Sequence, residues 1–164
     1  KYSPKPFSQF AYQDLSSQLF GAEAFHKENE FNDFNQEILL NQMLSTEGPR
    51  ILKGDVNKDG LEDVLLLGAK DDADKLFVQT ANGKFTQSNK AIFDNDKGFE
   101  STCGAFFDLE NDGDLDLLVG SGGNEPAESI KFIVRLYIND GKGNFQVDPS
   151  RIPPLVANLS TIQV

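Results

Sequence analysis

Asp55-Val56-Asn57-Lys58-Asp59-Gly60-Leu61-Glu62-Asp63 recurs 53 residues later in the chain as Asp108-Leu109-Glu110-Asn111-Asp112-Gly113-Asp114-Leu115-Asp116. Both copies place oxygen-bearing side chains at positions 1, 3, 5 and 9 and a glycine at position 6. Ca²⁺ prefers closely spaced carboxylate and carbonyl oxygens and tolerates irregular geometry. Without a cation, such a loop holds several like charges close together, which costs free energy. The sequence therefore predicts two calcium loops.

The glycine at position 6 permits a sharp turn that presents the backbone carbonyl of position 7 as a further ligand. The predicted ligands of the first site are Asp55, Asn57, Asp59, the carbonyl of Leu61, and Asp63. Those of the second site are Asp108, Glu110, Asp112, the carbonyl of Asp114, and Asp116. The alternative is a solvated hairpin turn, which Asp, Asn and Gly also favour. Two copies in equivalent contexts favour the metal interpretation.

These loops are not EF-hands, because an EF-hand requires a bidentate Glu at position 12 and a helix on either side. Position 12 is Leu66 in the first copy and Val119 in the second. Short apolar runs typical of strands flank each loop instead, at residues 51–54 and 64–68 and again at 104–107 and 117–120. Each loop is therefore predicted to join two strands of a hairpin.

The repeat continues beyond the loops. Residues 76–85 and 136–145 each form an apolar run, a turn rich in Gly and Asn, and a run that opens on Phe, which is typical of a β-hairpin. Their offset is 60 residues, so the second unit carries seven extra residues, which we place around 122–126. We predict a mainly β fold with two four-stranded antiparallel sheets of the propeller-blade type.

These units resemble FG-GAP/VCBS repeats, whose blades also build the propellers of integrin α-chains. The resemblance rests on residues 54–64, 107–117 and 136–145. It implies a β-propeller that carries its calcium loops in blade hairpins. Glu110 departs from the Asp or Asn that usually stands at position 3. Residues 26–34, Leu39-Leu40 and 47–49 are similar to the lead-in of bacterial VCBS/ASPIC-UnbV proteins, which are related to cartilage acidic protein and common on bacterial surfaces.

The chain divides into a lead-in or cap at residues 1–48, a first blade at 49–100, a second blade at 101–150, and an irregular end or truncated strand at 151–164. Phe31, Phe34, Ile38 and Met43 are spaced for a short amphipathic helix that packs on the core. A closed propeller has typically 4–8 blades. Three arrangements stay open: a capped two-sheet domain, chains paired through open sheet edges, or a fragment that needs further blades. We favour a self-contained two-sheet piece with self-association.

Charge and composition narrow the function. The chain carries 26 acidic and 15 basic residues, for a net charge of −11. Without clusters of Lys and Arg, we expect neither nucleic acid nor an anionic membrane surface as a partner. No stretch approaches the ~18 apolar residues of a membrane span. Cys103 is the sole cysteine, and its apolar context predicts a buried side chain rather than a nucleophile.

We therefore expect a non-catalytic calcium-binding module of an exported or cell-surface protein, located outside the cell, on its surface or in the periplasm. Weak calcium modules belong in such compartments. Met43 is the only Met, so we expect a processed piece of a longer chain. Its calcium is structural, and its partners are proteins or glycans. The alternatives are a carbohydrate-active enzyme that uses paired carboxylates among Glu100, Glu125 and Glu128, and a purely structural spacer.

Overall fold

The computed structural model describes residues 13–21, 24–28, 30–35, 38–41, 43, 45, 49–123 and 133–164. Two antiparallel sheets of four strands each dominate it. The first sheet consists of β1 (Ile51–Gly54), β2 (Asp63–Leu66), β3 (Lys75–Gln79) and β4 (Phe85–Ser88). The second consists of β5 (Ser101–Phe107), β6 (Asp116–Ser121), β7 (Val134–Asn139) and β8 (Phe145–Val147). The predicted mainly β class with two four-stranded antiparallel sheets is confirmed.

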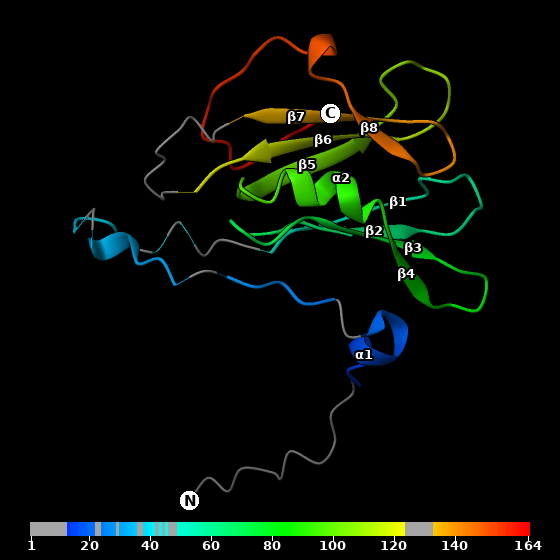
Figure 1. Ribbon diagram of the computed structural model, residues 1–164, viewed down its shortest axis with the longest axis horizontal. Helices are drawn as coiled ribbons and strands as arrows, with labels where there is room; N and C mark the ends of the chain where they lie inside the picture. The colour runs from blue at the N-terminus through cyan, green and yellow to red at the C-terminus, as the bar shows by residue number, and fades with distance from the viewer. Residues whose placement is uncertain are drawn as a thin grey trace, which may run out of the picture.

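Both sheets are simple meanders in which each strand pairs with the next along the chain. They lie as two stacked layers, with α2 (Lys90–Asn95) at their side (Figure 1). The registers of the sheets correspond residue by residue. Gly54 pairs with Asp63 as Phe107 pairs with Asp116. The two units therefore share strand order and register as well as sequence, although the described residues form no closed propeller.

The sheets pack through unlike faces. Leu65 of β2 and Leu117 of β6 both lie in the core between the layers, yet the residue of the first sheet equivalent to Leu117 is Val64. A one-residue change in strand position reverses the face of a side chain. The face of the second sheet that packs on the first sheet is therefore equivalent to the outer face of the first sheet. The two units stack head to tail.

The core between the layers is apolar and closely packed. Its buried members are Val56, Leu65, Leu67, Leu76, Phe93, Leu117, Val119, Tyr137 and Phe145. Each such side chain contributes about 1.5–3 kcal/mol through burial. Strands β1 and β5 approach closely, since a Cβ added at Gly104 of β5 would lie 2.9 Å from the side-chain Cδ1 of Leu52 in β1. It would also lie 3.0 Å from the Leu118 carbonyl oxygen of the neighbouring strand β6, so a larger residue would be crowded at this position.

Helix α2 joins the two layers and is absent from the expectations drawn from sequence. Its Phe93 is buried against Tyr137, with the ring centroids 5.3 Å apart. Asn89, just before the helix, has φ 55°. The Asn89 amide donates to the Gly143 carbonyl at 2.7 Å and accepts from Phe145 N–H at 3.0 Å. The link between the units is thereby fixed to the β7–β8 hairpin of the second.

The outer face of each sheet is covered by a segment from one end of the chain. Phe20, which follows α1 (Ser16–Leu19), stacks on Phe85 and meets Phe77 edge to face, with centroids 4.2 and 5.3 Å apart. On the second sheet, Leu159 N–H donates to Ser121 O at 3.1 Å. Figure 1 shows α1 and the C-terminal segment on opposite sides of the two layers. These contacts fit the capped arrangement, while the predicted self-association and the predicted domain boundaries stay predictions.

The predicted amphipathic helix within residues 31–45 is wrong for the described part of that segment. Only a short 3₁₀ helix, η2 (Asp33–Asn35), is found there. Ile38 is 83% exposed, so the apolar stripe does not face the core. The buried described residues are instead Asp33 and Ser45, and the Asp33 carboxylate accepts hydrogen bonds from Ser45 N–H and Oγ at 3.2 and 2.5 Å. A buried polar contact, rather than an apolar helix face, is thus what the described part of this segment shows.

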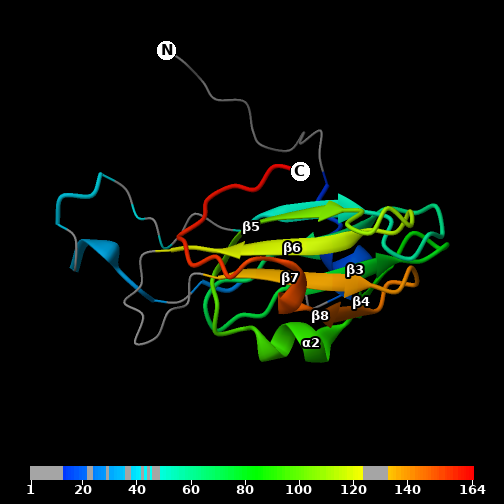
Figure 2. The ribbon, with the colours of Figure 1, turned by 90° about the horizontal axis from the view of Figure 1, so that it is seen from above.

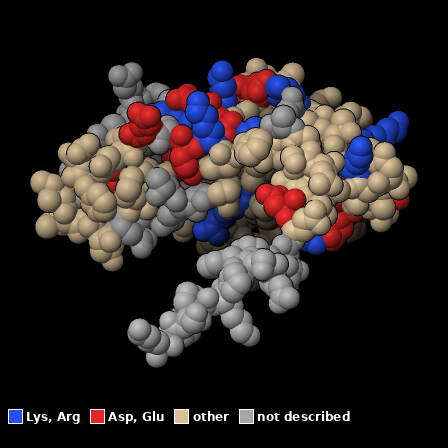
Figure 3. All heavy atoms as spheres, turned by 90° about the horizontal axis from the view of Figure 1, so that it is seen from below, with Lys and Arg blue, Asp and Glu red and all other residues tan. Residues whose placement is uncertain are grey.

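One face of the molecule carries charges of both signs. On the face drawn in Figure 3, Lys and Arg side chains are interspersed with Asp and Glu. Among the described residues, no helix is long and apolar enough to cross a membrane.

A buried polar network ties the two units together at the end of the sheets opposite the acidic loops. Arg135 of β7 is 4% exposed and donates to Ser101 Oγ at 2.6 Å and to Tyr137 Oη at 3.2 Å. Its guanidinium lies 3.7 Å from the carboxylate of Asp74, which belongs to the first unit and is 4% exposed. Burial raises the pKa of Asp74, while Arg135 opposes that shift. Removal of either side chain would therefore leave the charge of the other one buried without its partner.

We expect Arg135→Met to lower the free energy of unfolding by about 3–5 kcal/mol, because it leaves the buried Asp74 carboxylate without its cation. Urea denaturation of metal-free protein measures the loss. Arg151→Met is the control, since its ion pair with Asp148 is solvent-exposed and is worth about 0–1 kcal/mol. Similar losses in both variants would show that the Asp74–Arg135 pair does not hold the units together.

Candidate metal sites

The two acidic loops lie at the same end of the molecule. The first joins β1 to β2 and the second joins β5 to β6, and both sheets point these hairpins in one direction (Figures 1 and 2). The β7–β8 hairpin lies at this end as well. The predicted placement of each loop between two strands of a hairpin is confirmed.

The position-1 carboxylates organise the two loops in the same way. Asp55 accepts hydrogen bonds from the N–H groups of Asp59 and Gly60, at 3.1 and 2.8 Å. Asp108 accepts from Asp112 N–H and Gly113 N–H at 3.1 and 2.9 Å. Each glycine at position 6 has φ 84°, a left-handed conformation that glycine adopts without strain. The two loops are therefore built alike at the atomic level.

The position-9 carboxylates are fully buried and hold each loop to its sheet. Asp63 accepts from Val56 N–H at 3.0 Å and from Gln79 N–H of β3 at 2.8 Å. Asp116 accepts from Leu109 N–H at 3.0 Å and from Asn139 N–H of β7 at 2.9 Å. Burial raises the pKa of Asp63, and its two backbone hydrogen bonds act against that rise.

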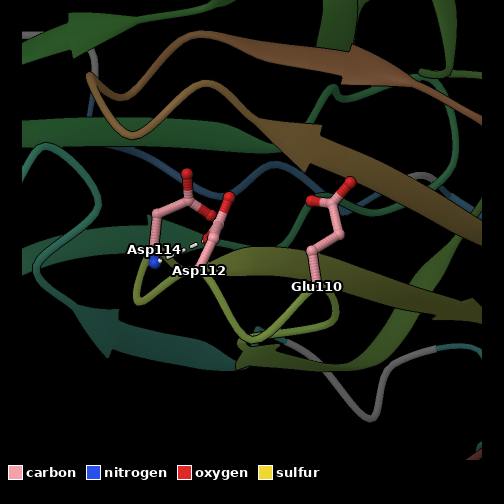
Figure 4. Close-up of side chains that lie close together, drawn as sticks. All are labelled: Glu110, Asp112 and Asp114. Carbon is pink, nitrogen blue, oxygen red and sulfur yellow. Dashed lines mark hydrogen bonds between the residues drawn. The ribbon is translucent and has the colours of Figure 1, made fainter.

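The second loop gathers three carboxylates. One oxygen atom from each of Glu110, Asp112 and Asp114 lies within 4.8 Å of the others. All three side chains project from the same side of the loop, as Figure 4 shows. Asp114 N–H donates to Asp112 Oδ1 at 3.1 Å, and this bond lowers the pKa of Asp112. This spacing allows one cation to contact all three groups.

Asp114 is the unusual member of this cluster. It is only 5% exposed, and its Oδ1 is a buried oxygen with no hydrogen-bond partner among the described residues. Burial, followed by the neighbouring charges of Asp112 and Asp116, raises the pKa of Asp114 to about 6. The sequence pointed only to the carbonyl of this residue as a ligand. A buried carboxylate oxygen without a donor fits a metal ion better than it fits a solvated turn.

Two cations from outside the second loop lie beside its acids. Arg151, just after β8, pairs with Glu110 and also donates to Asp148 at 3.0 Å. Lys58, from the first loop, lies near Asp114: a Cβ added at Gly141 would be 3.1 Å from Asp114 Oδ2 and 3.5 Å from Lys58 Nζ. The nearby ammonium acts against the rise in the Asp114 pKa. Sequence reasoning missed both cations because neither is adjacent to the loop in the chain.

The first loop lacks such a cluster. Within the described residues, only the second loop brings three carboxylates together. In the first, position 3 is an amide: Asn57 Oδ1 accepts from Asp59 N–H, and Asn57 Nδ2 donates to Asp59 Oδ2, both at 3.1 Å. Leu61 N–H donates to Asp59 Oδ1 at 2.8 Å. The first loop shares the fold of the second but offers fewer clustered charges.

Among the described residues, the remaining candidates carry no comparable geometry. Glu125 and Glu128, two of the carboxylates considered for an enzyme, lie outside the described residues. Cys103 is 3% exposed, as predicted, and burial raises the pKa of its thiol. His26 forms hydrogen bonds with Leu67 O and with Glu28 Oε1, at 3.1 and 2.5 Å.

Comparison with known families agrees with the resemblance drawn from sequence. Residues 55–119, which run from the first loop through the second, match the FG-GAP-like repeat. No curated protein and no solved structure matches the chain. The narrower likeness to bacterial VCBS/ASPIC-UnbV proteins stays a prediction.

Asp114→Asn should stabilise the metal-free protein and weaken its response to calcium. The amide removes a buried charge that lies beside the carboxylates of Asp112 and Asp116. Differential scanning calorimetry after chelation should show a higher midpoint for the variant than for the wild type. The exposed Asp140→Asn, in the β7–β8 hairpin, is the control and should show no such gain. A lower midpoint for Asp114→Asn would mean that its carboxylate stabilises the loop without metal.

Proposed function

We propose that the second loop of this FG-GAP-like repeat binds a divalent cation, with Ca²⁺ as the favoured ion. The observation that carries the proposal is Asp114, whose buried Oδ1 has no partner among the described residues and stands in a cluster with Glu110 and Asp112. A cation placed there satisfies this oxygen and removes repulsion between three carboxylates. Ca²⁺ suits a site built only of oxygen on an irregular loop.

The loop also supplies residues that would hold the ion in place. Glu110, Asp112 and Asp114 offer carboxylate oxygens, and Asp108 and Asp116 stand at positions 1 and 9 with backbone donors that fix their orientation. Hydrogen-bonded carboxylates of this kind are pre-oriented ligands. Arg151 restrains Glu110, whose longer side chain replaces the usual Asp or Asn at position 3.

The first loop is proposed as a second, weaker calcium site. Its support is the shared construction: Asp55 and Asp63 make the same backbone hydrogen bonds as Asp108 and Asp116. Its position-3 ligand is the neutral Asn57, so the site carries less negative charge than the second. Affinity for Ca²⁺ in such loops follows the number of charged ligands.

The wider role that fits these sites is a non-catalytic binding or adhesion module of an exported protein, with calcium as a structural ion. The cation would link loop order to the stability of the hairpins, because binding free energy adds to folding free energy. Acidic loops that are open to solvent suit the high calcium concentrations found outside cells. A protein or glycan is the proposed partner, and neither has a defined site among the described residues.

Thermal unfolding of chelator-stripped protein against calcium concentration tests the metal site. We expect the midpoint temperature to rise with Ca²⁺. The free energy of unfolding should increase by about 2.7 kcal/mol once the calcium concentration exceeds the dissociation constant 100-fold. Asp112→Ala should remove the larger part of this response and Asp59→Ala the smaller part. Each of these side chains is exposed, so neither variant should unfold the protein.

Mg²⁺ at equal concentration is the control ion, because it demands near-octahedral geometry and gives up its water reluctantly. An equal shift with both ions would indicate screening of the acidic loops rather than a calcium site. A midpoint that does not move with calcium in a folded protein would show that both loops are ordinary acidic turns.

A further inference from the structure

One side chain, the amide of Asn139, connects the two acidic loops. Asn139 lies at the end of β7 and is 6% exposed. Its Nδ2 donates to the carbonyl of Val56, position 2 of the first loop, at 2.7 Å. The same Nδ2 donates to the carbonyl of Leu115, position 8 of the second loop, at 3.1 Å. Asn139 therefore contacts the backbone of both loops through one nitrogen.

These bonds belong to a longer chain of hydrogen bonds that ends on a position-9 carboxylate at each side. Val56, whose carbonyl accepts from Asn139, donates its own N–H to Asp63 Oδ2 at 3.0 Å. Asn139 in turn donates its backbone N–H to Asp116 Oδ1 at 2.9 Å. The two candidate ligands Asp63 and Asp116 are thus linked through only two residues. Asp63, Val56 and Asp116 are 0% exposed, so the path is shielded from water.

Close packing makes the connection rigid. The amide oxygen of Asn139 accepts from Gly143 N–H at 3.1 Å, which fixes the side chain within the β7–β8 hairpin. Gly143 has φ 79°, and a Cβ added there would lie 3.4 Å from Asn57 Cβ and 3.5 Å from Val56 Cγ2. The hairpin of the second unit therefore rests directly on the first loop. A shift of one loop cannot occur without disturbing these contacts.

The head-to-tail stacking explains why this contact is made. Gln79 of the first sheet is the counterpart of Asn139, since each donates its N–H to the position-9 carboxylate of its own loop. Asn139 also pairs with Phe145, which faces the core between the layers. Its side chain is thereby directed at the preceding unit, where it reaches the first loop. The repeat geometry places the amide of one unit against the metal loop of the unit before it.

We propose that Asn139 couples the two loops, so that calcium bound in either loop raises the affinity of the other. This inference rests on the proposed calcium sites. A bound ion fixes the loop backbone and the position-9 carboxylate at its site. Through Val56 and Asn139 this order is passed to the other loop, which then loses less conformational freedom when it binds its own ion.

Isothermal titration with calcium, on the full chain after chelation, measures the coupling. Asp59→Ala leaves only the second loop able to bind, and Asp112→Ala leaves only the first. We expect each single-loop protein to bind calcium about five-fold or more weakly than the same loop in the wild type, and the wild-type isotherm to be steeper than the sum of the two. This comparison leaves Asn139 itself unchanged.

Asn139→Ala then tests the path. Its isotherm should equal the sum of two independent loops, with the cooperativity lost even where both loops still bind. Asn144→Ala is the matched control: it lies in the same hairpin, is exposed, and bonds only with Asp140 among the described residues. It should retain the wild-type coupling. If Asn139→Ala does not fold, the single-loop comparison alone decides whether the loops are coupled.

The outcomes separate this inference from the proposed function. A wild-type protein with no calcium response would overturn both. Three other outcomes would overturn the coupling but leave a calcium site in place. The two loops bind independently, only one loop binds, or the second loop binds more tightly once the first is disabled. Retained cooperativity in folded Asn139→Ala would overturn the role of this side chain.

Discussion

The buried carboxylate at position 9 of each loop is the constraint on which the rest of the structure depends. Asp63 and Asp116 each bind the N–H of position 2 in their own loop and the N–H of a residue in the third strand of their own sheet. One side chain therefore fixes a loop and two strands together. A fully buried carboxylate is costly unless donors surround it. The strands and the loop must consequently close around it in one register, which gives both units the same shape.

This constraint is local in sequence, and it is the reason that so much of the fold could be predicted. The acidic loop, its flanking apolar runs and the Gly/Asn turn all lie within one unit. The hydrophobic pattern and the turn residues therefore both predict four strands per unit. Helix α2 was missed because it is short and its stability comes from packing Phe93 on Tyr137 of a distant strand. The helix predicted near Ile38 was wrong because the hydrogen bond between Asp33 and Ser45 determines the conformation there. Hydrophobic periodicity cannot indicate such a polar contact.

The candidate site was predictable to a similar extent. Spacing placed Glu110 and Asp112 of the observed carboxylate cluster among the predicted ligands, because side chains at alternate loop positions converge. The ligand assignments themselves stay predictions. The side chain of Asp114 was missed, since position 7 normally contributes its carbonyl, and only the structure places this carboxylate in a buried position beside Asp112. The pairing of Arg151 with Glu110 joins residues 41 positions apart, beyond any local pattern. Long-range contacts therefore determine how each loop differs from its copy.

The head-to-tail stacking turns a sequence repeat into a connected structure. Because unlike faces meet, the third strand of the second unit lies against the loop of the first, and Asn139 can reach Val56. A symmetric, face-to-face packing of two identical units would bury the same faces and leave no such contact. Two cations held in the proposed sites would repel one another, and each would reduce the negative charge that attracts the other. The two loops nevertheless share hydrogen bonds among buried residues, which water does not screen. In the proposed coupling, rigid contact between the units, rather than charge, is therefore the term that would favour binding at both loops together.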